Sequence, residues 1–331
     1  MECIMTKVRI LGAGVMGLVI ATELVARGHD VDIVDPKLGP GTHSCSWWAG
    51  GMLAPWCEGV SAEEAVERLG ALGINWWKSH TGHVVTNGTL VVATSRDRGE
   101  LEHFARRSHR YQRLETEEIG RLEPDLASRF QSALFYEQEA HLSPRETLSF
   151  LHGELQKKSV GFFKEEPQTP VDLVIDARGL SARDKLLDLR GVRGEIIILR
   201  CPEVQLSRPI RLLHPRFPLY IVPRGDGIYM LGATMIESDN RGPITARSLF
   251  ELLSAAWTIH PAFGEAEVLE LGAESRPAFP DNLPKLRRYG SRIFANGLYR
   301  HGFLLSPSVA RMAADHIEQG IIPELMDVCE W

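Results

Sequence analysis

The 331-residue sequence lacks the features that define several large classes of protein. It has five cysteines, an odd number, with no Cys-x-x-Cys pair and no histidine pattern beside them: Cys3, Cys45, Cys57, Cys201 and Cys329. This argues against a disulfide framework and a zinc site, so we expect reduced thiols and no metal. No hydrophobic run approaches the roughly twenty residues that span a bilayer, so we expect no membrane partner. The N-terminus leads into a strand rather than a signal peptide, which favours a cytoplasmic protein.

The sequence also has little excess of charge of either sign, because 43 acidic and 37 basic residues leave a net charge of −6. The basic residues are scattered, and the adjacent pairs that begin at Arg106 and Arg287 are typical of solvated faces. Nucleic acid is therefore not an expected partner. The chain has no internal repeat, low-complexity tract or long linker, so we expect its domains to be interleaved. With 44% hydrophobic and 24% charged residues, its composition is that of a globular protein.

The most informative feature that is present is the glycine motif Gly12-x-Gly14-x-x-Gly17. It follows the apolar run Val8–Leu11 and precedes the helix-like run Leu18–Ala26. In such a strand–turn–helix unit, the glycines permit a tight turn and let a pyrophosphate approach the backbone. The helix N-terminus adds free N–H groups and the positive end of its dipole. The motif therefore predicts a bound dinucleotide.

Asp35 ends a second apolar run about twenty residues beyond the motif. A carboxylate there accepts hydrogen bonds from a ribose diol and repels a 2′-phosphate, which favours FAD or NAD over NADP. A nicotinamide-binding fold normally continues through another helix into a third parallel strand. Here an irregular stretch of small residues and indoles, Ser44–Trp56, follows instead and favours FAD. The alternative left open is a glycine-rich surface loop with Trp47, Trp48 and Trp56 as core aromatics.

Periodicity and turn residues predict the remaining elements. Val84–Val92 contains two β-branched runs joined by Asn87-Gly88, which predicts a β-hairpin with a type I′ turn. Ser143-Pro144 predicts a helix start, and Val171–Asp176 predicts a buried strand that returns the chain to the nucleotide domain. Further strands are expected at Val31–Val34, Glu195–Cys201, Leu219–Pro223, Ile228–Met235 and Arg292–Gly297, and helices at Gly99–Ser108, Glu115–Glu123, Leu148–Leu155, Ala246–Trp257 and from the last turn to about Ile317.

These elements predict an α/β fold of two interleaved domains. One is a Rossmann-type FAD-binding domain, expected at residues 1–80, 135–194 and 273–331. The other is a substrate domain built on a mixed, largely antiparallel β-sheet, expected at residues 81–134 and 195–272.

Seven segments of the chain, in order, resemble the glycine oxidase family, the flavoenzymes of thiamine-thiazole biosynthesis within the D-amino acid oxidase superfamily. They are Ile10–Gly17, Asp35, Ala49–Pro55, Leu219–Arg224, Leu231–Met235, Glu274–Pro277 and Leu298–Pro307. The likeness covers nearly the whole chain. It implies a glutathione-reductase-like nucleotide fold, non-covalent FAD, and oxidation of glycine or a similar small amine to its imine with O₂ taking the electrons.

The resemblance also implies three substrate-binding residues. Arg276 corresponds to the arginine that clamps the substrate carboxylate, Tyr220 to a tyrosine of the active-site wall, and Arg300 to a second arginine that contacts substrate. A guanidinium suits the clamp because two parallel charge-assisted hydrogen bonds fix both position and rotation. The alternatives left open are a salt bridge from Arg276 to a neighbour such as Asp281 and a surface ion pair for Arg300. Tyr220 has the alternative of a core position with its hydroxyl satisfied. Hydride transfer from a neutral amine needs little proton chemistry from the protein, so the absence of an obvious base is no objection, and His301 is expected to have a positional role.

By the same resemblance, FAD lies against the glycine motif, the small-residue stretch and the start of the final helix. The turn Gly302–Pro307 offers N–H groups and a helix dipole to negative charge on the pyrimidine end of the flavin. The expected cofactor-binding residues are Gly12, Gly14, Val15, Met16, Gly17, Asp35, Pro36, Ser46, Gly50, Gly51, Met52, Ala177, Gly179, Leu298, Tyr299, Arg300, His301, Gly302, Phe303 and Leu304.

Two departures from the family pattern are visible. The segment between Gly161 and Val171 is short where relatives carry a strand and a small β-meander beside the adenine, which leaves the adenine contacts open. Trp47-Trp48 replaces smaller residues, and we hypothesise that the indoles narrow the space beside the flavin and favour a very small substrate.

The leading hypothesis is an FAD-dependent oxidase that converts glycine to its imine and supplies thiazole formation. One alternative is an oxidase or dehydrogenase of sarcosine, a D-amino acid or a cyclic imino acid, because Arg276 would serve any α-amino carboxylate. Others are a catalytically silent flavin-binding subunit and a nicotinamide-dependent dehydrogenase. The expected partners are a small amino-acid substrate and O₂. Family resemblance adds a homo-oligomer and possible transfer of the product to a thiazole synthase.

Overall fold

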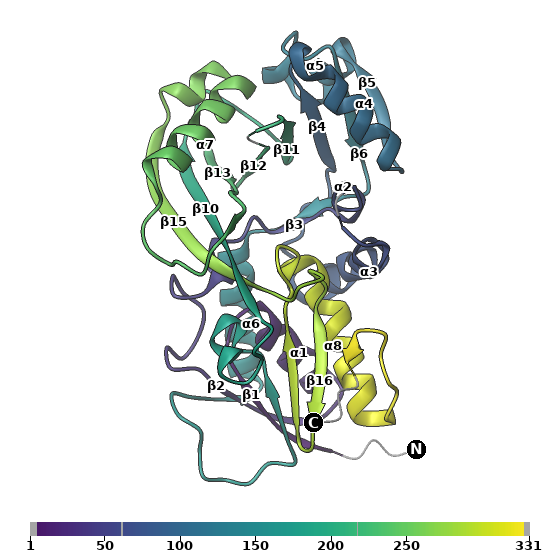
Figure 1. The fold of residues 1–331 in the computed structure, drawn as a ribbon, viewed down its shortest axis with the longest axis vertical. Coiled ribbons are helices and arrows are strands. Elements are labelled where there is room, and N and C mark those ends of the chain that lie inside the picture. The colour runs from purple at the N-terminus through teal and green to yellow at the C-terminus, as the bar shows by residue number, and fades with distance from the viewer. Residues whose placement is uncertain (1–4, 61, 217, 328–331) are drawn as a thin grey trace.

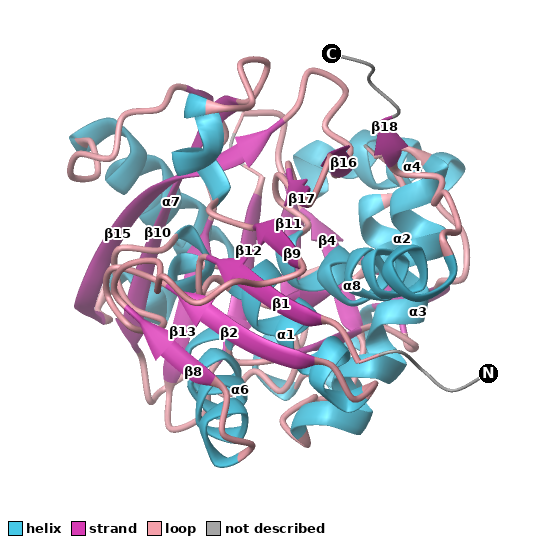
Figure 2. Cartoon of the chain, turned by 90° about the horizontal axis from the view of Figure 1, so that it is seen from below, coloured by secondary structure: helices cyan, strands magenta, loops and turns pink. Residues whose placement is uncertain are grey.

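The computed structural model describes residues 5–60, 62–216 and 218–327, which form an α/β fold with two large sheets (Figure 1). The first sheet has a parallel centre, in which β1 (Lys7–Leu11) pairs with β2 (Asp30–Val34) and β9 (Leu173–Asp176). Val8 and Ile10 of β1 are fully buried, as is usual for a central parallel strand. Figure 2 shows β8, β2 and β1 side by side. The strand order is β18 (Met326–Asp327), β16 (Lys285–Tyr289), β17 (Arg292–Asn296), β9, β1, β2 and β8 (Gly161–Phe163).

A group of helices packs against this sheet through α1 (Val15–Ala26). α1 contacts α8 (Gly302–Gln319), and α8 contacts α3 (Glu64–Thr81). The approach of α3 to α8 depends on Gly73, because a Cβ there would lie 2.6 Å from the carbonyl oxygen of Leu304. This packing holds the start of α8 close to the glycine turn that precedes α1.

The second sheet is largely antiparallel and has nine strands within the described residues. Its longest strands, β10 (Arg190–Arg200) and β15 (Glu267–Ala278), pair with each other and extend toward the first sheet (Figure 1). Side chains alternate between its faces, so that Ile197 packs with α7 (Ala246–Ile259) while Ile196 packs on the opposite face. The other strands are β4 (Thr89–Ala93), β5 (Gln112–Glu115), β6 (Ser132–Tyr136), β11 (Ile210–Leu213), β12 (Leu219–Pro223), β13 (Ile228–Gly232) and β14 (Ile236–Glu237), and β3 (Met52–Leu53) pairs separately with β7 (Ala140–His141).

Most of the predicted elements are confirmed. The helices α4 (Arg98–Arg107), α5 (Thr116–Leu122), α6 (Pro144–Lys157), α7 and α8 lie where they were expected, and Pro144 occupies the first turn of α6. The strands β2, β9, β10, β12, β13 and β17 also match. The long elements α3 and β15 were missed. β15 carries exposed apolar side chains, including Leu271, so its sequence lacks a clear alternation of buried and exposed positions.

The predicted hairpin at Val84–Val92 is wrong. Val85 forms an isolated bridge with His141, while β4 pairs with β6 and with β11. All five residues of β4 are buried, so this strand needs neighbours on both edges, which the short segment before Asn87 does not supply. Gly88 has a φ of +79° and redirects the chain between two different pairings.

The sequence predicts that the chain after β2 does not continue directly through a helix into a third parallel strand, as a nicotinamide-binding fold would, and the structure agrees. The strand beside β2 is β8, which follows α6 rather than the next helix after β2. The division into residues 1–80, 135–194 and 273–331 against 81–134 and 195–272 stays a proposal, and β6, β10 and β15 cross its boundaries.

Within the described residues no helix is long and apolar enough to cross a membrane. Of the cysteines, three are free thiols, and Cys3 and Cys329 lie outside the described residues: the free ones are Cys45, Cys57 and Cys201.

Candidate active site

A cavity of about 830 Å³ lies between the two sheets. Its lining comes from the turn before α1, the segment after β2, the inner face of β10, β12 and β13, and the start of α8. Asp35 and Glu166 line it together with the glycine turn, and Tyr220, Arg276 and Arg300 also line it. Its volume lies in the upper part of the range for cavities that bury small molecules and cofactors.

The glycine turn before α1 has the close packing that its motif predicts. Gly12 has a φ of +101°, and a Cβ there would lie 2.8 Å from the carbonyl oxygen of Ala177. A Cβ on Gly17 would lie 1.9 Å from the carbonyl oxygen of Gly12, so only glycine lets α1 start this close to β1. The carboxylate of Asp35 accepts hydrogen bonds from the N–H groups of Ala13 at 2.9 Å and Lys37 at 2.8 Å. These bonds hold Asp35 at the end of β2, facing the cavity.

The N-terminus of α1 lies at the cavity and suits a diphosphate. Gly14 caps the helix without a side-chain hydrogen bond, and no acidic residue lies in the first turn. The hydroxyl oxygen of Ser46 accepts a hydrogen bond from the N–H of Val15 at 3.1 Å, which brings the segment Cys45–Trp48 against the turn. The positive end of the helix dipole and the absence of an acidic residue from the first turn of α1 favour a bound anion here.

The structure brings the predicted cofactor-binding residues together with one exception. Gly17 does not line the cavity, because it packs on the backbone of Gly12 inside the turn. All the others line the cavity: Gly12, Gly14, Val15, Met16, Asp35, Pro36, Ser46, Gly50, Gly51, Met52, Ala177, Gly179, Leu298, Tyr299, Arg300, His301, Gly302, Phe303 and Leu304. Their roles toward the cofactor stay a proposal.

The start of α8 forms another wall of the cavity. The N–H of Tyr299 donates to the carbonyl oxygen of Pro277 at 2.9 Å, and Tyr299 has a φ of +51°. This bend leads into the cap residue His301, which has no side-chain capping bond, and then into Gly302. The first turn contains no acidic residue, so its N–H groups and dipole are available to stabilise negative charge.

Arg276 lines the cavity from β15, and no carboxylate within the described residues lies at ion-pair distance from it. Its Nη1 donates to the carbonyl oxygen of Thr234 at 3.2 Å. Burial and the nearby Arg300 guanidinium lower the pKa of Arg276. The alternative of a salt bridge to Asp281 is wrong, because Asp281 pairs with Lys285 at 2.7 Å.

The backbone of β10 supports Arg276 directly. A Cβ on Gly194 would lie 1.9 Å from Nη2 of Arg276, so the guanidinium rests where a side chain of β10 would otherwise stand. Beside it, the hydroxyl of Thr234 accepts from the N–H of Glu195 at 2.9 Å and donates to its carboxylate at 3.1 Å. Gly194 and Thr234 together therefore define the position of the Arg276 guanidinium.

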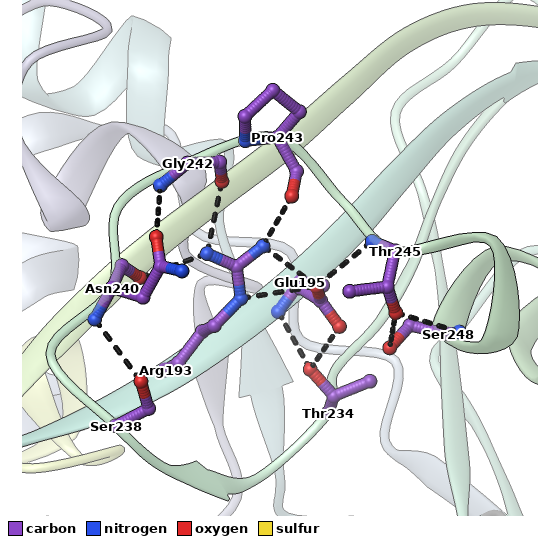
Figure 3. A network of polar contacts seen from close by, with 9 residues as sticks. All are labelled: Arg193, Glu195, Thr234, Ser238, Asn240, Gly242, Pro243, Thr245 and Ser248. Atoms are coloured by element: carbon purple, nitrogen blue, oxygen red, sulfur yellow. Dashed lines mark hydrogen bonds and ion pairs between the residues drawn. The ribbon is translucent and has the colours of Figure 1, made fainter.

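The segment that carries Thr234 is anchored by a buried ion pair, shown in Figure 3. Arg193 and Glu195 lie 2.7 Å apart on β10, and both side chains are at most 5% exposed. The guanidinium donates to three carbonyl oxygens of the segment, and the carboxylate accepts from the N–H of Thr245 at 3.3 Å. The three carbonyls belong to Asn240, Gly242 and Pro243. The side chains of Arg193 and Glu195 thus hold the segment from Thr234 to Thr245 at both of its ends and in its middle.

Tyr220 and Arg300 meet at a residue that sequence reasoning missed, Glu58. The Tyr220 hydroxyl donates to Oε1 of Glu58 at 2.9 Å, and Arg300 forms an ion pair with Oε2. His301 Nε2 lies 3.2 Å from the same oxygen. The alternative of a surface ion pair for Arg300 is wrong, because Arg300 is 18% and Glu58 11% exposed at the side chain. The Tyr220 hydroxyl has a hydrogen-bond partner, as the alternative of a core position predicted, but Tyr220 also lines the cavity.

Ionisation around Glu58 follows from its cationic neighbours. Burial opposes its charge, yet the Arg300 guanidinium, the His301 contact and the Arg211 guanidinium hold the pKa of Glu58 well below its usual range. Burial lowers the pKa of His301, which favours the neutral ring. Burial also raises the pKa of Tyr220 well above its usual value, so the hydroxyl keeps its proton. The only sequence signal for Glu58 was a single carboxylate within the apolar run Leu53–Val60.

The two departures from the family pattern have different outcomes. Glu166, in the shortened segment, lines the cavity, as Asp35 does, so this connection reaches the cavity. Trp48 lines the cavity but Trp47 does not, so the hypothesis that both indoles narrow it is wrong for Trp47. Arg145 holds both rings, with its guanidinium carbon 5.1 Å and 5.0 Å from their centroids. The third indole, Trp56, is a buried core residue.

A nucleotide-binding turn, a long cavity and a buried cationic end define a class of enzyme, and comparison with known proteins identifies it. A family model described as FAD dependent oxidoreductase matches residues 7–316, and the chain belongs to this family. In particular, it is 50% identical over 321 residues to the putative thiamine biosynthesis oxidoreductase ThiO of Rhizobium etli, across 95% of this chain and 98% of that one. It is 26% identical to the glycine oxidase of Pseudomonas aeruginosa, across 93% and 94% of the chains.

A solved structure agrees with the fold. The crystal structure of glycine oxidase from Bacillus cereus superposes with a TM-score of 0.82 at 23% identity, across 97% of this chain and 99% of that one. The predicted fold class is therefore confirmed, and the enzyme is an oxidoreductase that uses FAD. The alternative of a nicotinamide-dependent dehydrogenase is wrong. The N-terminus of α1, which has no acidic residue in its first turn, and a cavity lined by both Asp35 and Arg300 fit this cofactor.

Proposed function

We propose that the enzyme oxidises glycine to its imine with O₂ as the electron acceptor, and that the imine is used to build the thiazole ring of thiamine. The observation that carries the proposal is Arg276, a cavity-lining guanidinium without a carboxylate partner among the described residues. A substrate with a single carboxylate would complete this ion pair through two parallel hydrogen bonds. The likeness to ThiO over nearly the whole of both chains supports the biosynthetic role.

The residues around Arg276 would orient such a substrate. Thr234 and Gly194 fix the guanidinium, so a bound carboxylate would be fixed in position and rotation. Tyr220 and Arg300 would form the adjacent wall, both held by Glu58. The pKa values of Glu58 and His301 are both lowered, so both groups are weak proton acceptors, and we assign them a positioning role rather than that of a base.

When bound, FAD supplies the chemistry, by taking two electrons from the substrate and passing them to O₂. Overall, glycine loses a hydride from its α-carbon and a proton from its nitrogen to leave the imine, and these two hydrogens with their two electrons convert O₂ to H₂O₂. Water would convert an imine that is not used to glyoxylate and ammonia. The start of α8 would stabilise negative charge at the pyrimidine end of the cofactor through its N–H groups and dipole.

Three further elements belong to this proposal. Assembly as a homo-oligomer and transfer of the imine to a thiazole synthase rest on the family resemblance, and location in the cytoplasm is proposed with them. A flavin-binding subunit without activity is disfavoured, because Arg276 is held by Gly194 of β10 and by Thr234 of the loop after β13 in a position that a purely structural arginine would not need. Sarcosine, a D-amino acid or a cyclic imino acid remains the second candidate substrate, since each would also satisfy Arg276.

An anaerobic absorbance titration of the FAD-bound protein with glycine, sarcosine, D-alanine and D-proline tests the proposal. Glycine is expected to bleach the flavin absorbance most readily, and air is expected to restore it at once. Bleaching by a bulkier amine alone would replace glycine as the substrate. Bleaching that air does not reverse would indicate a dehydrogenase, and no bleaching by any of the four amines would contradict the proposal.

A further inference from the structure

The guanidinium groups of Arg276 and Arg300 both line the cavity, but they differ in what they can offer to a ligand. Within the described residues, Arg276 has no ion-pair partner and donates to the carbonyl oxygen of Thr234 at 3.2 Å. Arg300 instead forms an ion pair with Glu58. The two guanidinium groups are close enough for Arg300 to lower the pKa of Arg276. The cavity thus holds two neighbouring cations, one free and one neutralised.

Glu58 is held in place from several directions. Its Oε1 accepts from the Tyr220 hydroxyl at 2.9 Å, and His301 Nε2 lies 3.2 Å from Oε2. Arg211 lies 3.9 Å from Oε1, whereas Arg300 contacts Oε2. Rotation of Glu58 away from Arg300 would break contacts with three other side chains, so displacement of Glu58 by a ligand would carry a large free-energy cost.

The third cation in this region cannot replace Arg300 as a partner for a ligand. The guanidinium carbon of Arg211 lies 4.8 Å from the ring centroid of Phe104 and 5.0 Å from that of Tyr220. Its Nη1 donates to the carbonyl oxygen of Cys57 at 2.9 Å. Only 8% of Arg211 is exposed. The other arginines that line the cavity, Arg178, Arg241 and Arg292, also have carboxylate partners, so among the described residues a ligand carboxylate finds one cavity-lining guanidinium without such a partner, that of Arg276.

We propose that Glu58 determines substrate specificity by occupying Arg300, so that the site accepts a ligand with one carboxylate and rejects a ligand with two. A second carboxylate directed at Arg300 would meet the like charge of Glu58 at close range, which is a repulsive element against the wrong substrate. With Glu58 neutral, Arg276 and Arg300 would form a binding pair for a dicarboxylate. This inference rests on the proposed function in one respect, the role of Arg276 as the carboxylate ligand.

The test measures binding of unreactive carboxylates to the FAD-bound protein, by the change in flavin absorbance. Acetate is the probe with one carboxylate, and malonate and succinate are probes with two at different separations. Glu58→Gln keeps the volume and the ability to accept from Tyr220 but removes the charge. Glu274→Gln is the matched control, because it removes an equal charge from the cavity wall beside Arg241 and leaves the pair of Glu58 and Arg300 intact.

In the wild-type protein, acetate is expected to bind more tightly than either dicarboxylate. In Glu58→Gln, the better of the two dicarboxylates is expected to gain about tenfold in affinity relative to acetate, the size of one additional charge-assisted pair. The added substitution Arg300→Gln is expected to remove that gain. Turnover of iminodiacetate relative to glycine is expected to rise in parallel.

Three outcomes would overturn the inference: tighter binding of a dicarboxylate by the wild-type protein, an unchanged preference in Glu58→Gln, or an equal change in Glu274→Gln. The first of these does not depend on any variant being stable. Binding of acetate without oxidation of glycine would contradict the proposed function and still leave this test valid, because the probes are not oxidised.

Discussion

Replacing Gly194 with alanine tests whether the Arg276 guanidinium is the carboxylate-binding group. The added Cβ would lie 1.9 Å from Nη2, 2.2 Å from Cζ and 2.5 Å from Nη1 of Arg276. Ordinary van der Waals contact begins at 3.4 Å, so the guanidinium has to move by about 1.5 Å. Because the displaced atoms are the end of a flexible side chain facing a cavity, the strand can keep its place and the fold is expected to survive.

The magnitude follows from the hydrogen bonds that such a displacement breaks. A shift of this size is too large for both parallel bonds to a carboxylate to keep good geometry. Loss of one bond to a charged group costs about 1.5–3 kcal/mol, which corresponds to a roughly 10- to 100-fold weaker affinity. We expect the KM for glycine and the dissociation constant for acetate to rise by this factor, while kcat at saturating glycine changes less.

The assay is oxygen consumption over a range of glycine concentrations, together with acetate binding followed by flavin absorbance. Gly153→Ala on α6 is the control, since its Cβ would meet nothing within 4 Å. Both variants are expected to retain FAD. A KM within twofold of the wild type in Gly194→Ala, with FAD retained, would refute the role given to Arg276.

Three further predictions follow from the packing and the ionisation of buried groups. Gly17→Ala is expected to abolish FAD retention, measured as flavin absorbance per protein, because its Cβ would lie 1.9 Å from the backbone oxygen of Gly12, and full retention would contradict this. Arg193→Met is expected to lower the melting temperature, since removing one partner of a buried ion pair costs about 3–5 kcal/mol; an unchanged temperature would argue against the anchoring role. Burial raises the pKa of Glu139 to about 7 from 4.5, so the folded state binds its proton more tightly and this contribution to stability is lost as pH rises from 4.5 through 7. Glu139→Gln should therefore gain melting temperature relative to the wild type between pH 5 and pH 8, and a constant difference would exclude this titration.

The nucleotide end of the site was predictable because its parts are close in sequence. The motif Gly12-x-Gly14-x-x-Gly17 lies between a strand and a helix that were also predicted, and Asp35 ends the next strand. The glycines are required by close local packing, as at Gly17, where a Cβ would lie 1.9 Å from the carbonyl oxygen of Gly12. Requirements between residues this close in sequence produce a motif that can be recognised in the sequence.

The substrate end could be predicted only in part. Family resemblance indicated Arg276, Tyr220 and Arg300, and the structure places all three at the cavity. It did not indicate Glu58, which is 242 positions from Arg300 and 162 from Tyr220. The sequence around Glu58 does not indicate its partners, because Tyr220 lies on β12 and Arg300 lies in the turn before α8, both far away in the sequence.

The sequence by itself determined the fold class, the nucleotide turn and most helix positions, since these depend on neighbours within a few residues. Only the tertiary structure decided that β4 pairs with β6 and β11 rather than with the residues before it. It also decided that Gly194 supports Arg276 and that Glu58 occupies Arg300. Strand partners and charge partners are chosen by which distant surfaces pack together, and that choice is made by the folded chain as a whole.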